Sequence, residues 1–211
     1  MTFVPSPAVL LAFAAASVLL AATPGPDMAL FLSRTLGGGR PHGFAALAGA
    51  MTGLLAHTFG AALGLSALLA ASERAYDAVK LAGALYLLYL AYGALRHGAA
   101  LRLEGQGGGN GGLARSYVTG LLINLTNPKI VLFFVTFLPQ FIEAGDAGAS
   151  GKFFVLGLEF IAIGVVVNAA IILAASRFVA AAKANLRAVR WFDYGFAGLM
   201  GAFAARLILG A

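Results

Sequence analysis

The chain has 211 residues, of which 61% are hydrophobic and only 10% are charged, and its mean hydropathy is +0.91. A soluble domain carries about 25% charged residues, so this composition predicts an integral membrane protein. The absence of cysteine excludes disulfides and thiolate metal sites. The net charge of +6 does not indicate nucleic-acid binding, because no basic and aromatic stripe accompanies it and short cytoplasmic loops collect such cations.

Six apolar segments can cross a bilayer, whose core of about 30 Å needs about 20 helical residues. They are residues 6–33, 43–71, 78–95, 117–141, 153–175 and 191–209. The first of them has no Lys or Arg before it and continues directly into Pro-Gly-Pro-Asp. We therefore interpret it as a retained span rather than as a secretory signal.

The first segment is interrupted by Pro24, Gly25 and Pro26, and Asp27 follows directly. Proline removes one backbone N–H and blocks a further hydrogen bond, so the helix is expected to break here. In lipid, the freed backbone groups are tolerated only where they are buried in protein or line a watery cavity. We expect this stretch to form one wall of a polar site.

The second segment carries no formal charge, and its glycines form small-xxx-small pairs. Since lipid supplies no hydrophobic force between helices, close packing through glycine is the expected substitute. The glycines in question are Gly49, Gly53, Gly60 and Gly64 here, and Gly195, Gly198 and Gly201 in the sixth segment. His57 lies in the middle of the second segment, where a role as ligand or proton relay competes with that of a hydrogen-bonded packing residue.

The fourth segment is also interrupted, by Asn124, Asn127, Pro128 and Lys129. Lys129 lies 12 residues from either end of its segment, which is about 18 Å at 1.5 Å per residue. A lysine at such depth costs at least about 2.5 to 3.5 kcal/mol. It therefore needs a partner, and Asp27 is the obvious candidate. The two charges could bind substrate, or they could form a structural ion pair that holds the protein together.

The fifth segment contains two further polar residues. Glu159 lies near its start and is expected to reach an interfacial partner. Asn168 lies deeper, where it lines the cavity or forms a hydrogen bond across helices.

Pro24 and Pro128 are 104 residues apart, about half the chain, and each lies in the first segment of a three-segment half. Three is an odd number, so the halves enter the membrane from opposite sides as an inverted repeat. Interrupted helices at equivalent places in two such halves indicate the binding site of a secondary transporter. We predict one membrane domain that comprises a first half of residues 1–100, a glycine-rich loop of residues 101–116 and a second half of residues 117–211.

The fold class is thus an all-α integral membrane protein with six transmembrane helices, arranged as an inverted 3+3 repeat with broken first and fourth helices. The loops after segments one, three and five hold nine Lys and Arg residues, and the opposite side holds four. Cytoplasmic loops collect the excess. Both termini are therefore predicted to lie outside the cytoplasm.

At these residues the chain resembles the lysine exporter (LysE/RhtB) family of bacterial amino-acid efflux proteins, over essentially its whole length. The resemblance rests on TPGPD (23–27), GLLAH (53–57), KLAGALYLLYLAYGALR (80–96) and NLTNPKIVLFFVTFLPQF (124–141). It implies export of amino acids or related small metabolites across the bacterial inner membrane, driven by an ion gradient. It also implies the site residues Pro24, Gly25, Pro26, Asp27, His57, Asn124, Asn127, Pro128, Lys129, Pro139 and Gln140.

The leading prediction for function is a proton-coupled exporter of an amino acid or a similar zwitterion, with sodium as the alternative coupling ion. With no Walker A motif, ATP is not the direct drive. A passive channel for small polar solutes is the second reading. An intramembrane enzyme is disfavoured, because Ser66 and His57 are nine residues apart, which is about 13 Å along a helix.

The expected partners are the substrate, the coupling ion and the lipid bilayer, with no nucleic acid. We expect no cofactor and no metal site, since the sequence contains no dense cluster of carboxylates. A homodimer is a further expectation, because the glycine-lined faces exceed what the packing of six helices needs.

Overall fold

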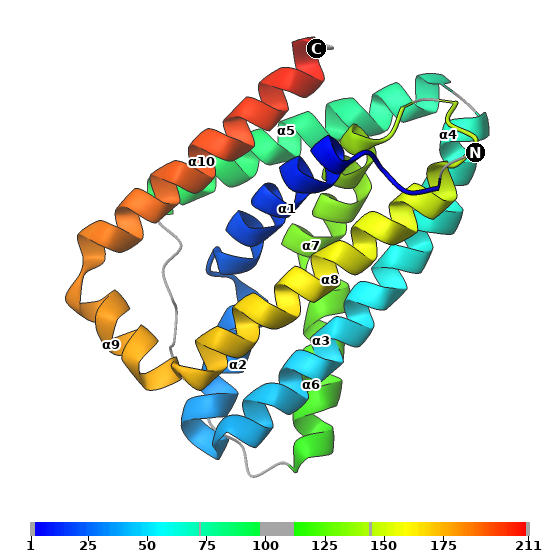
Figure 1. Ribbon diagram of the computed structural model, residues 1–211. Helices are drawn as coiled ribbons and strands as arrows, with labels where there is room; N and C mark the ends of the chain where they lie inside the picture. The colour runs from blue at the N-terminus through cyan, green and yellow to red at the C-terminus, as the bar shows by residue number, and fades with distance from the viewer. Residues whose placement is uncertain (1–2, 72, 98–111, 144, 210–211) are drawn as a thin grey trace.

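A computed structural model describes residues 3–71, 73–97, 112–143 and 145–209 of the chain (Figure 1). Within these ranges all regular structure is helical. Two stretches, Arg40–Leu68 and Ala149–Leu173, are long and apolar enough to cross a membrane, and two bent helix pairs meet the same criterion when each pair is taken as one span. The predicted all-helical membrane protein is confirmed at this level.

The first bent pair consists of α1 (Pro7–Ala22) and α2 (Pro26–Gly38), whose axes differ by 53°. The Ser6 hydroxyl caps α1 by accepting the Val9 N–H at 3.4 Å. Pro26 opens α2 from the first helical position, where its missing N–H breaks no helical hydrogen bond. The interruption predicted at residues 24–26 is confirmed.

The second bent pair consists of α6 (Leu113–Thr126) and α7 (Pro128–Leu132), and it bends by 49°. Asn127 caps α7, because its Oδ1 accepts the backbone N–H of Lys129 at 3.0 Å. Beyond α7 the chain continues as the π-helix η2 (Phe133–Phe137) and the 3₁₀-helix η3 (Leu138–Phe141). The predicted break is confirmed, but residues 113–116, predicted as loop, are already helical.

The remaining helices lie close to the other predicted segments. The helix α3 (Arg40–Gly60) continues through the π-helix η1 (Ala61–Leu65) into α4 (Ser66–Ala71). It is followed by α5 (Glu73–His97), α8 (Ala149–Leu173), α9 (Ala175–Ala184) and α10 (Leu186–Leu209). The short α9 was not predicted. Residues 101–111 of the predicted glycine-rich loop lie outside the described residues.

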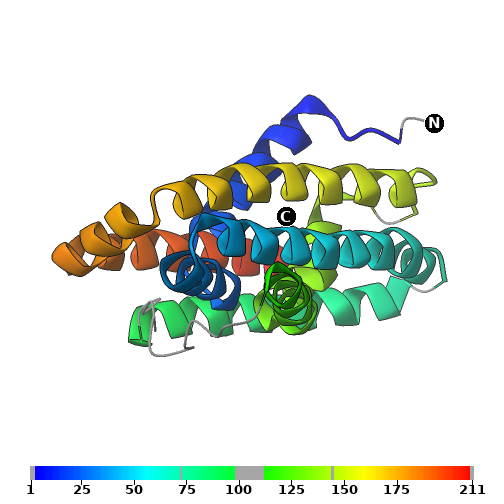
Figure 2. The ribbon, with the colours of Figure 1, turned by 90° about the horizontal axis from the view of Figure 1, so that it is seen from below.

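The two interrupted spans lie in the middle of the bundle. The helix α5 packs along α10, and α3 packs along both α6 and α8. In Figure 1, α1 and α7 lie between the α5–α10 pair and the α3–α8 pair. Figure 2 shows α8, α3 and α5 running in nearly the same direction at different heights, with α6 seen end-on. This arrangement buries Thr23 of the first break and Asn127 of the second, while Pro26 and Pro128 remain exposed.

Glycine allows α3 and α6 to touch through their backbones. A Cβ atom on Gly49 would collide with the carbonyl oxygen of Tyr117, and one on Gly120 would collide with that of Ala46. A Cβ on Gly53 would lie 2.6 Å from Asn124 Oδ1. The predicted role of glycine in helix packing is therefore confirmed for the first half of the second segment.

The same prediction is wrong for the other glycines of the pattern. A Cβ on any of them would have no atom within 4 Å, because these positions face away from the neighbouring helices. They are Gly60, Gly64, Gly195, Gly198 and Gly201.

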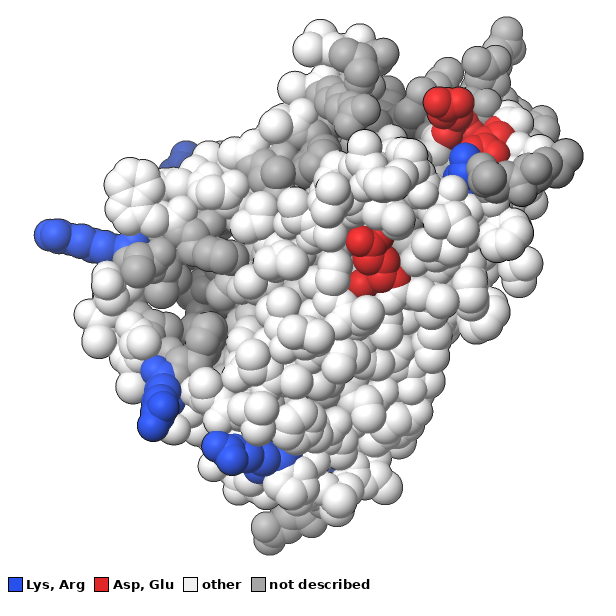
Figure 3. Space-filling view, in the orientation of Figure 1, with Lys and Arg blue, Asp and Glu red and all other residues white. Residues whose placement is uncertain are grey.

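Polar side chains also make contacts at the two ends of the bundle. At one end Arg40 donates to the Leu173 carbonyl at 2.8 Å, and His42 Nδ1 lies 3.1 Å from Ser116 Oγ. At the other end, Lys152 pairs with Asp146, and this contact, aided by the Gly148 N–H, lowers the pKa of the Asp146 carboxyl. Figure 3 shows Lys and Arg along the left and lower left of the visible face, acidic groups beside a basic one at the upper right, and a single acidic group in the otherwise uncharged band between.

Candidate functional site

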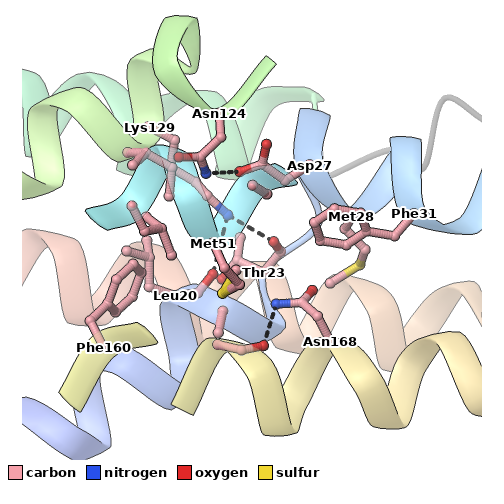
Figure 4. A pocket seen from close by; sticks show the side chains of 15 residues that line it. Leu20, Thr23, Asp27, Met28, Phe31, Met51, Asn124, Lys129, Phe160 and Asn168 are labelled. Atoms are coloured by element: carbon pink, nitrogen blue, oxygen red, sulfur yellow. Dashed lines mark hydrogen bonds between the residues drawn. The ribbon is translucent and has the colours of Figure 1, made fainter. Parts of the chain in front are cut away.

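The two helix breaks meet at the carboxylate of Asp27. Its Oδ2 atom accepts hydrogen bonds from Asn127 Nδ2 at 2.9 Å and from Asn124 Nδ2 at 3.1 Å. Asn124 and Asn127 are 1% and 2% exposed, so these bonds are shielded from solvent. Figure 4 shows the contact between Asn124 and Asp27. The prediction that the breaks lie close together inside the bundle is confirmed.

The side chain of Lys129 forms hydrogen bonds at the C-terminal end of α1. Its Nζ donates to the carbonyl oxygens of Leu20 at 3.1 Å and Thr23 at 3.0 Å (Figure 4). The helical donor for the Leu20 carbonyl would be residue 24, but Pro24 has no N–H. The Leu20 carbonyl instead shares the Thr23 N–H at 3.2 Å, and the ammonium adds a second donor at the end of α1, where the helix dipole is negative.

Asp27, the candidate partner predicted for Lys129, makes no direct contact with it. Lys152 pairs with Asp146, whereas Asp27 and Lys129 form no salt bridge with one another. Each central charge is instead bound by neutral groups of the opposite break: the carboxylate by two amides, and the ammonium by two carbonyls. The two residues nevertheless hold equivalent places, since Asp27 follows Pro26 in α2 and Lys129 follows Pro128 in α7.

The lysine side chain approaches Gly25 closely. The φ of this glycine, −170°, is an extended conformation that any residue adopts. A Cβ at this position, however, would lie 3.2 Å from Lys129 Nζ and 3.5 Å from Lys129 Cε. A larger residue would push the ammonium away from the carbonyls that bind it.

A cavity of about 40 Å³ adjoins these groups. A single water molecule needs about 10 to 15 Å³ measured in this way, so the cavity accommodates a few waters or an ammonium group. A whole amino acid enters only if the surrounding helices move apart. The polar residues of the lining are Thr23, Asp27, Asn124, Lys129 and Asn168, and most of the apolar lining is made by Leu20, Met28, Phe31, Met51, Leu54, Ile130 and Phe160.

Two acceptor atoms at the cavity have no hydrogen-bond partner. They are Asp27 Oδ1 and Asn124 Oδ1, and both are buried. Buried polar atoms are nearly always satisfied in native proteins, so each such exception calls for a reason.

His57 lies behind Asn124 rather than in the cavity wall. Its ring packs against Phe134 with 5.5 Å between centroids, and its Nε2 is 3.4 Å from the Asn124 backbone oxygen. Of the two readings that the sequence left open, these contacts favour the packing histidine.

Gln140 and Pro139 are in η3, away from the other predicted site residues. Gln140 Nε2 donates to the Thr136 carbonyl at 3.1 Å, and neither residue lines the cavity. The structure therefore brings together Pro24, Gly25, Pro26, Asp27, Asn124, Asn127, Pro128 and Lys129, with His57 behind them and Gln140 apart.

Several lining residues were not singled out in the sequence. Phe31 follows Asp27 by four residues, so the helical period places it on the same face of α2 and would have identified it, whereas Met28, the next residue, is turned by about 100°. Met51 and Phe160 come from α3 and α8, and no local pattern connects those helices with the breaks. Asn168 does line the cavity, while its Nδ2 donates to the Gly164 carbonyl at 2.8 Å.

Two broken helices whose ends meet around buried charged groups are typical of secondary transporters. The profile of the family described as LysE type translocator matches residues 18–211. The chain belongs to this family. It is therefore a multi-pass membrane transporter and not an enzyme, as the sequence predicted.

Relatives with assigned activities support this class. The chain is 30% identical over 149 residues to the leucine efflux protein of Klebsiella pneumoniae, covering 70% of each protein. It is 30% identical over 158 residues to the homoserine/homoserine lactone efflux protein of Salmonella typhimurium, covering 74% of this chain and 75% of that protein. An uncharacterized membrane protein of Vibrio cholerae is 33% identical over 159 residues, with 74% and 76% covered. No solved structure matches the chain.

Proposed function

We propose that this protein exports amino acids or related small zwitterions from the bacterial cytoplasm by proton-coupled alternating access. The observation that carries the proposal is the junction of the two breaks, where Asp27 and Lys129 are each bound by groups of the opposite break beside a buried cavity. The printed activities of the leucine and homoserine efflux relatives support the substrate class.

The alternating-access step rests on six spans in an inverted repeat. Helix packing supports it: α3 packs against α6 as α8 packs against α1, and α5 packs against α10. In an inverted repeat, α1 would correspond to α6, α3 to α8 and α5 to α10. The contact of α3 with α6 then corresponds to that of α8 with α1, as observed. The two halves then rock against one another around the fixed breaks.

Asp27 is the group proposed to couple transport to protons. It is the acidic residue of the cavity lining, and two amides of the opposite break hold its carboxylate. When it is ionised it balances the charge of Lys129 and binds substrate. Protonation from the outside weakens both interactions, which favours release of substrate and return of the protonated carrier.

Uptake into inverted membrane vesicles tests this proposal. With an imposed proton gradient, at least one amino acid of a panel of the twenty should accumulate with saturable kinetics. Asp27→Asn should abolish the accumulation. Glu159→Gln is the matched control, because it exchanges a carboxylate for an amide in α8 at a position that does not line the cavity.

The alternatives give different results in the same vesicles. Accumulation that a sodium gradient drives and a proton gradient does not would identify sodium, rather than the proton, as the coupling ion. Flux that rises linearly with concentration, without a gradient, would contradict the exporter and favour a passive channel.

A further inference from the structure

We propose that the exposed surface formed by α9 and the start of α10 binds the headgroups of anionic phospholipids. This surface, called the basic face below, comprises Arg177, Arg187, Arg190, Trp191 and Tyr194. Binding at the basic face does not depend on which substrate the protein transports.

The helix α9 lies at the level where the membrane meets water. The preceding helix α8 has 25 residues, which is about 38 Å at 1.5 Å per residue and exceeds the bilayer core of about 30 Å. It ends at Leu173, whose carbonyl is bound by Arg40, and α9 begins at Ala175. In Figures 1 and 2, α9 lies at the left edge of the bundle and leads the chain from α8 into α10. A helix in this place is within reach of lipid headgroups.

The helix α9 has an apolar side against the protein and a basic side that faces outward. Ala175 and Val179 are buried. They pack in one cluster with Met28 and Leu32 of α2. Arg177 is exposed, and at about 100° per residue it points about 180° away from the mean direction of the two buried residues. A basic residue opposite a buried apolar side is typical of helices that lie in the membrane interface.

The first turns of α10 continue the basic face. Arg187, Trp191 and Tyr194 share one side of the helix by its period and are exposed, whereas Phe196 on the opposite side is buried. Arg190 is also exposed, and its guanidinium carbon lies 5.9 Å from the centre of the Tyr194 ring. The rings of Trp191 and Tyr194 meet edge to face at 5.8 Å between centroids. Trp and Tyr are enriched at membrane interfaces, and arginine matches the geometry of phosphate oxygens.

The positive charge of this segment is not balanced within the protein. Residues 160–192 contain four basic residues and no acidic one, and the next acidic residue, Asp193, is 2% exposed. Among the residues that the structure describes, no carboxylate forms a salt bridge with Arg177, Arg187 or Arg190. Clusters of Lys and Arg at the membrane surface are typical of contacts with anionic lipids.

The apolar groups beside the arginines favour a lipid over a soluble anion. Trp191 is 73% exposed, and Leu173 at the end of α8 is 51% exposed. A soluble phosphate ester or a nucleic acid would leave both side chains in water, whereas the acyl chains of a lipid would cover them. A lipid therefore matches both the charge and the apolar area of this surface.

A lipid bound to the basic face would act on the candidate site through α2. The buried side of α9 shares a cluster with Met28, which follows Asp27 and lines the cavity. A lipid that holds α9 in place would stabilise this contact, because a ligand stabilises the state that binds it. Proton-driven uptake, a readout that rests on the proposed function, should therefore be faster in vesicles that contain anionic lipid.

Fluorescence of Trp191 tests the binding directly, because it is the single tryptophan of the chain. The full-length protein is reconstituted in phosphatidylcholine vesicles that contain a small, fixed fraction of brominated lipid as a quencher. Brominated phosphatidylglycerol should quench Trp191 more strongly than brominated phosphatidylcholine at the same fraction, because the arginines enrich the anionic lipid nearby. The difference should shrink at high ionic strength, which screens the charges.

Variants tie the effect to the basic face. The triple variant Arg177→Gln, Arg187→Gln, Arg190→Gln should lose the preference for phosphatidylglycerol. Arg115→Gln is the matched control, because it removes an exposed arginine at the start of α6, at the same end of the bundle, and it should keep the preference. If the triple variant does not fold, the single variant Arg187→Gln should still weaken the preference more than the control does.

Equal quenching by the two lipids, or a preference that survives in the triple variant, would overturn the proposal. Loss of the preference in Arg115→Gln as well would show that net charge alone attracts the lipid, and it would overturn a local site. Loss of the preference on addition of soluble glycerol phosphate at constant ionic strength would assign the basic face to free phosphate esters and exclude lipid as its ligand.

The fluorescence readout is independent of transport. Absence of uptake for every amino acid would contradict the exporter and leave the lipid site intact. A preference for phosphatidylglycerol without any effect of this lipid on uptake would contradict the connection through α2 and confirm the lipid site alone.

Discussion

At the scale of single residues, the centre of the protein depends on an exchange of partners between the two breaks. Asp27 is held by amides of the second break, and Lys129 is held by carbonyls of the first. The charges therefore do not neutralise one another by direct contact.

The first residue-scale prediction concerns both charges. Losing one partner of a directly paired buried ion pair costs about 3 to 5 kcal/mol, and the cost should be smaller here because the charges do not touch. Asp27→Asn and Lys129→Gln should each destabilise the protein, and the double variant should be at least as stable as either single one. All three should lose proton-driven uptake into inverted vesicles. Recovery of uptake in the double variant would show that the two charges have only a structural role.

Asn127 provides a second test, because its side-chain oxygen and nitrogen make different hydrogen bonds. Its Oδ1 caps α7 by accepting from Lys129 N, and its Nδ2 donates to Asp27. Asn127→Asp keeps the cap but sets a second carboxylate against Asp27, whereas Asn127→Ser keeps a capping hydroxyl and adds no charge. A hydrogen bond to a charged group contributes about 1.5 to 3 kcal/mol.

Both Asn127 variants should therefore unfold at lower temperature in detergent at neutral pH, and Asn127→Asp should be the less stable of the two. Equal stability of Asn127→Asp and the wild type would contradict the observed contact with Asp27.

At the scale of elements, the crossing of α3 and α6 positions the second break. Gly49 and Gly120 allow the two backbones to touch, and Asn124 follows one turn later on α6 against Gly53. The spacing between these helices therefore sets how far Asn124 reaches toward Asp27. A change in helix packing is transmitted directly to the site.

A larger side chain in place of glycine should destabilise the protein at this crossing but not at an unpacked position. Overpacking a close contact costs about 1 to 3 kcal/mol, and contact with a backbone carbonyl leaves little room for adjustment. Gly49→Val should lower the unfolding temperature and impair uptake. Gly64→Val is the matched control, since a Cβ there would have no atom within 4 Å. Equal tolerance at the two positions would contradict the observed crossing.

At the scale of the whole molecule, the two ends of the bundle differ in charge as the predicted orientation requires. Arg40 of the first connection reaches the end of α8, and His42 reaches Ser116 at the start of α6. The connections predicted to be cytoplasmic therefore share one end. The start of α1 and the end of α10 lie away from that end in Figure 1. The contacts and the excess of cations in these connections support cytoplasmic placement of this end.

Cysteine labelling tests the orientation, and the natural chain contains no cysteine that would interfere. A cysteine at position 108, in the predicted cytoplasmic loop, should react with an impermeant reagent only after the inner membrane is permeabilised. A cysteine in place of the exposed Ala147, near the opposite end, should react in intact cells. The reverse pattern would overturn the assignment of nine cations to the cytoplasmic side and four to the other.

The sequence by itself determined the helical segments and the two breaks, because both follow from local chemistry. An apolar run of sufficient length forms a helix in lipid, and a proline inside it removes a hydrogen bond wherever the chain folds. Asp27, Asn127 and Lys129 could be recognised for the same reason, since polar groups placed beside a break at membrane depth require partners.

Only the tertiary structure decided which partners these are. The binding of Lys129 by the Leu20 and Thr23 carbonyls, the absence of a direct contact with Asp27, and the arrival of Met51 and Phe160 at the cavity depend on the distances between helices. The same holds for Gly49 and Gly64, which share a sequence pattern although only the first is packed. Helical periodicity fixes which residues share a face, but lipid is as apolar as the side chains it contacts, so hydropathy alone cannot distinguish a face that meets another helix from one that meets the bilayer.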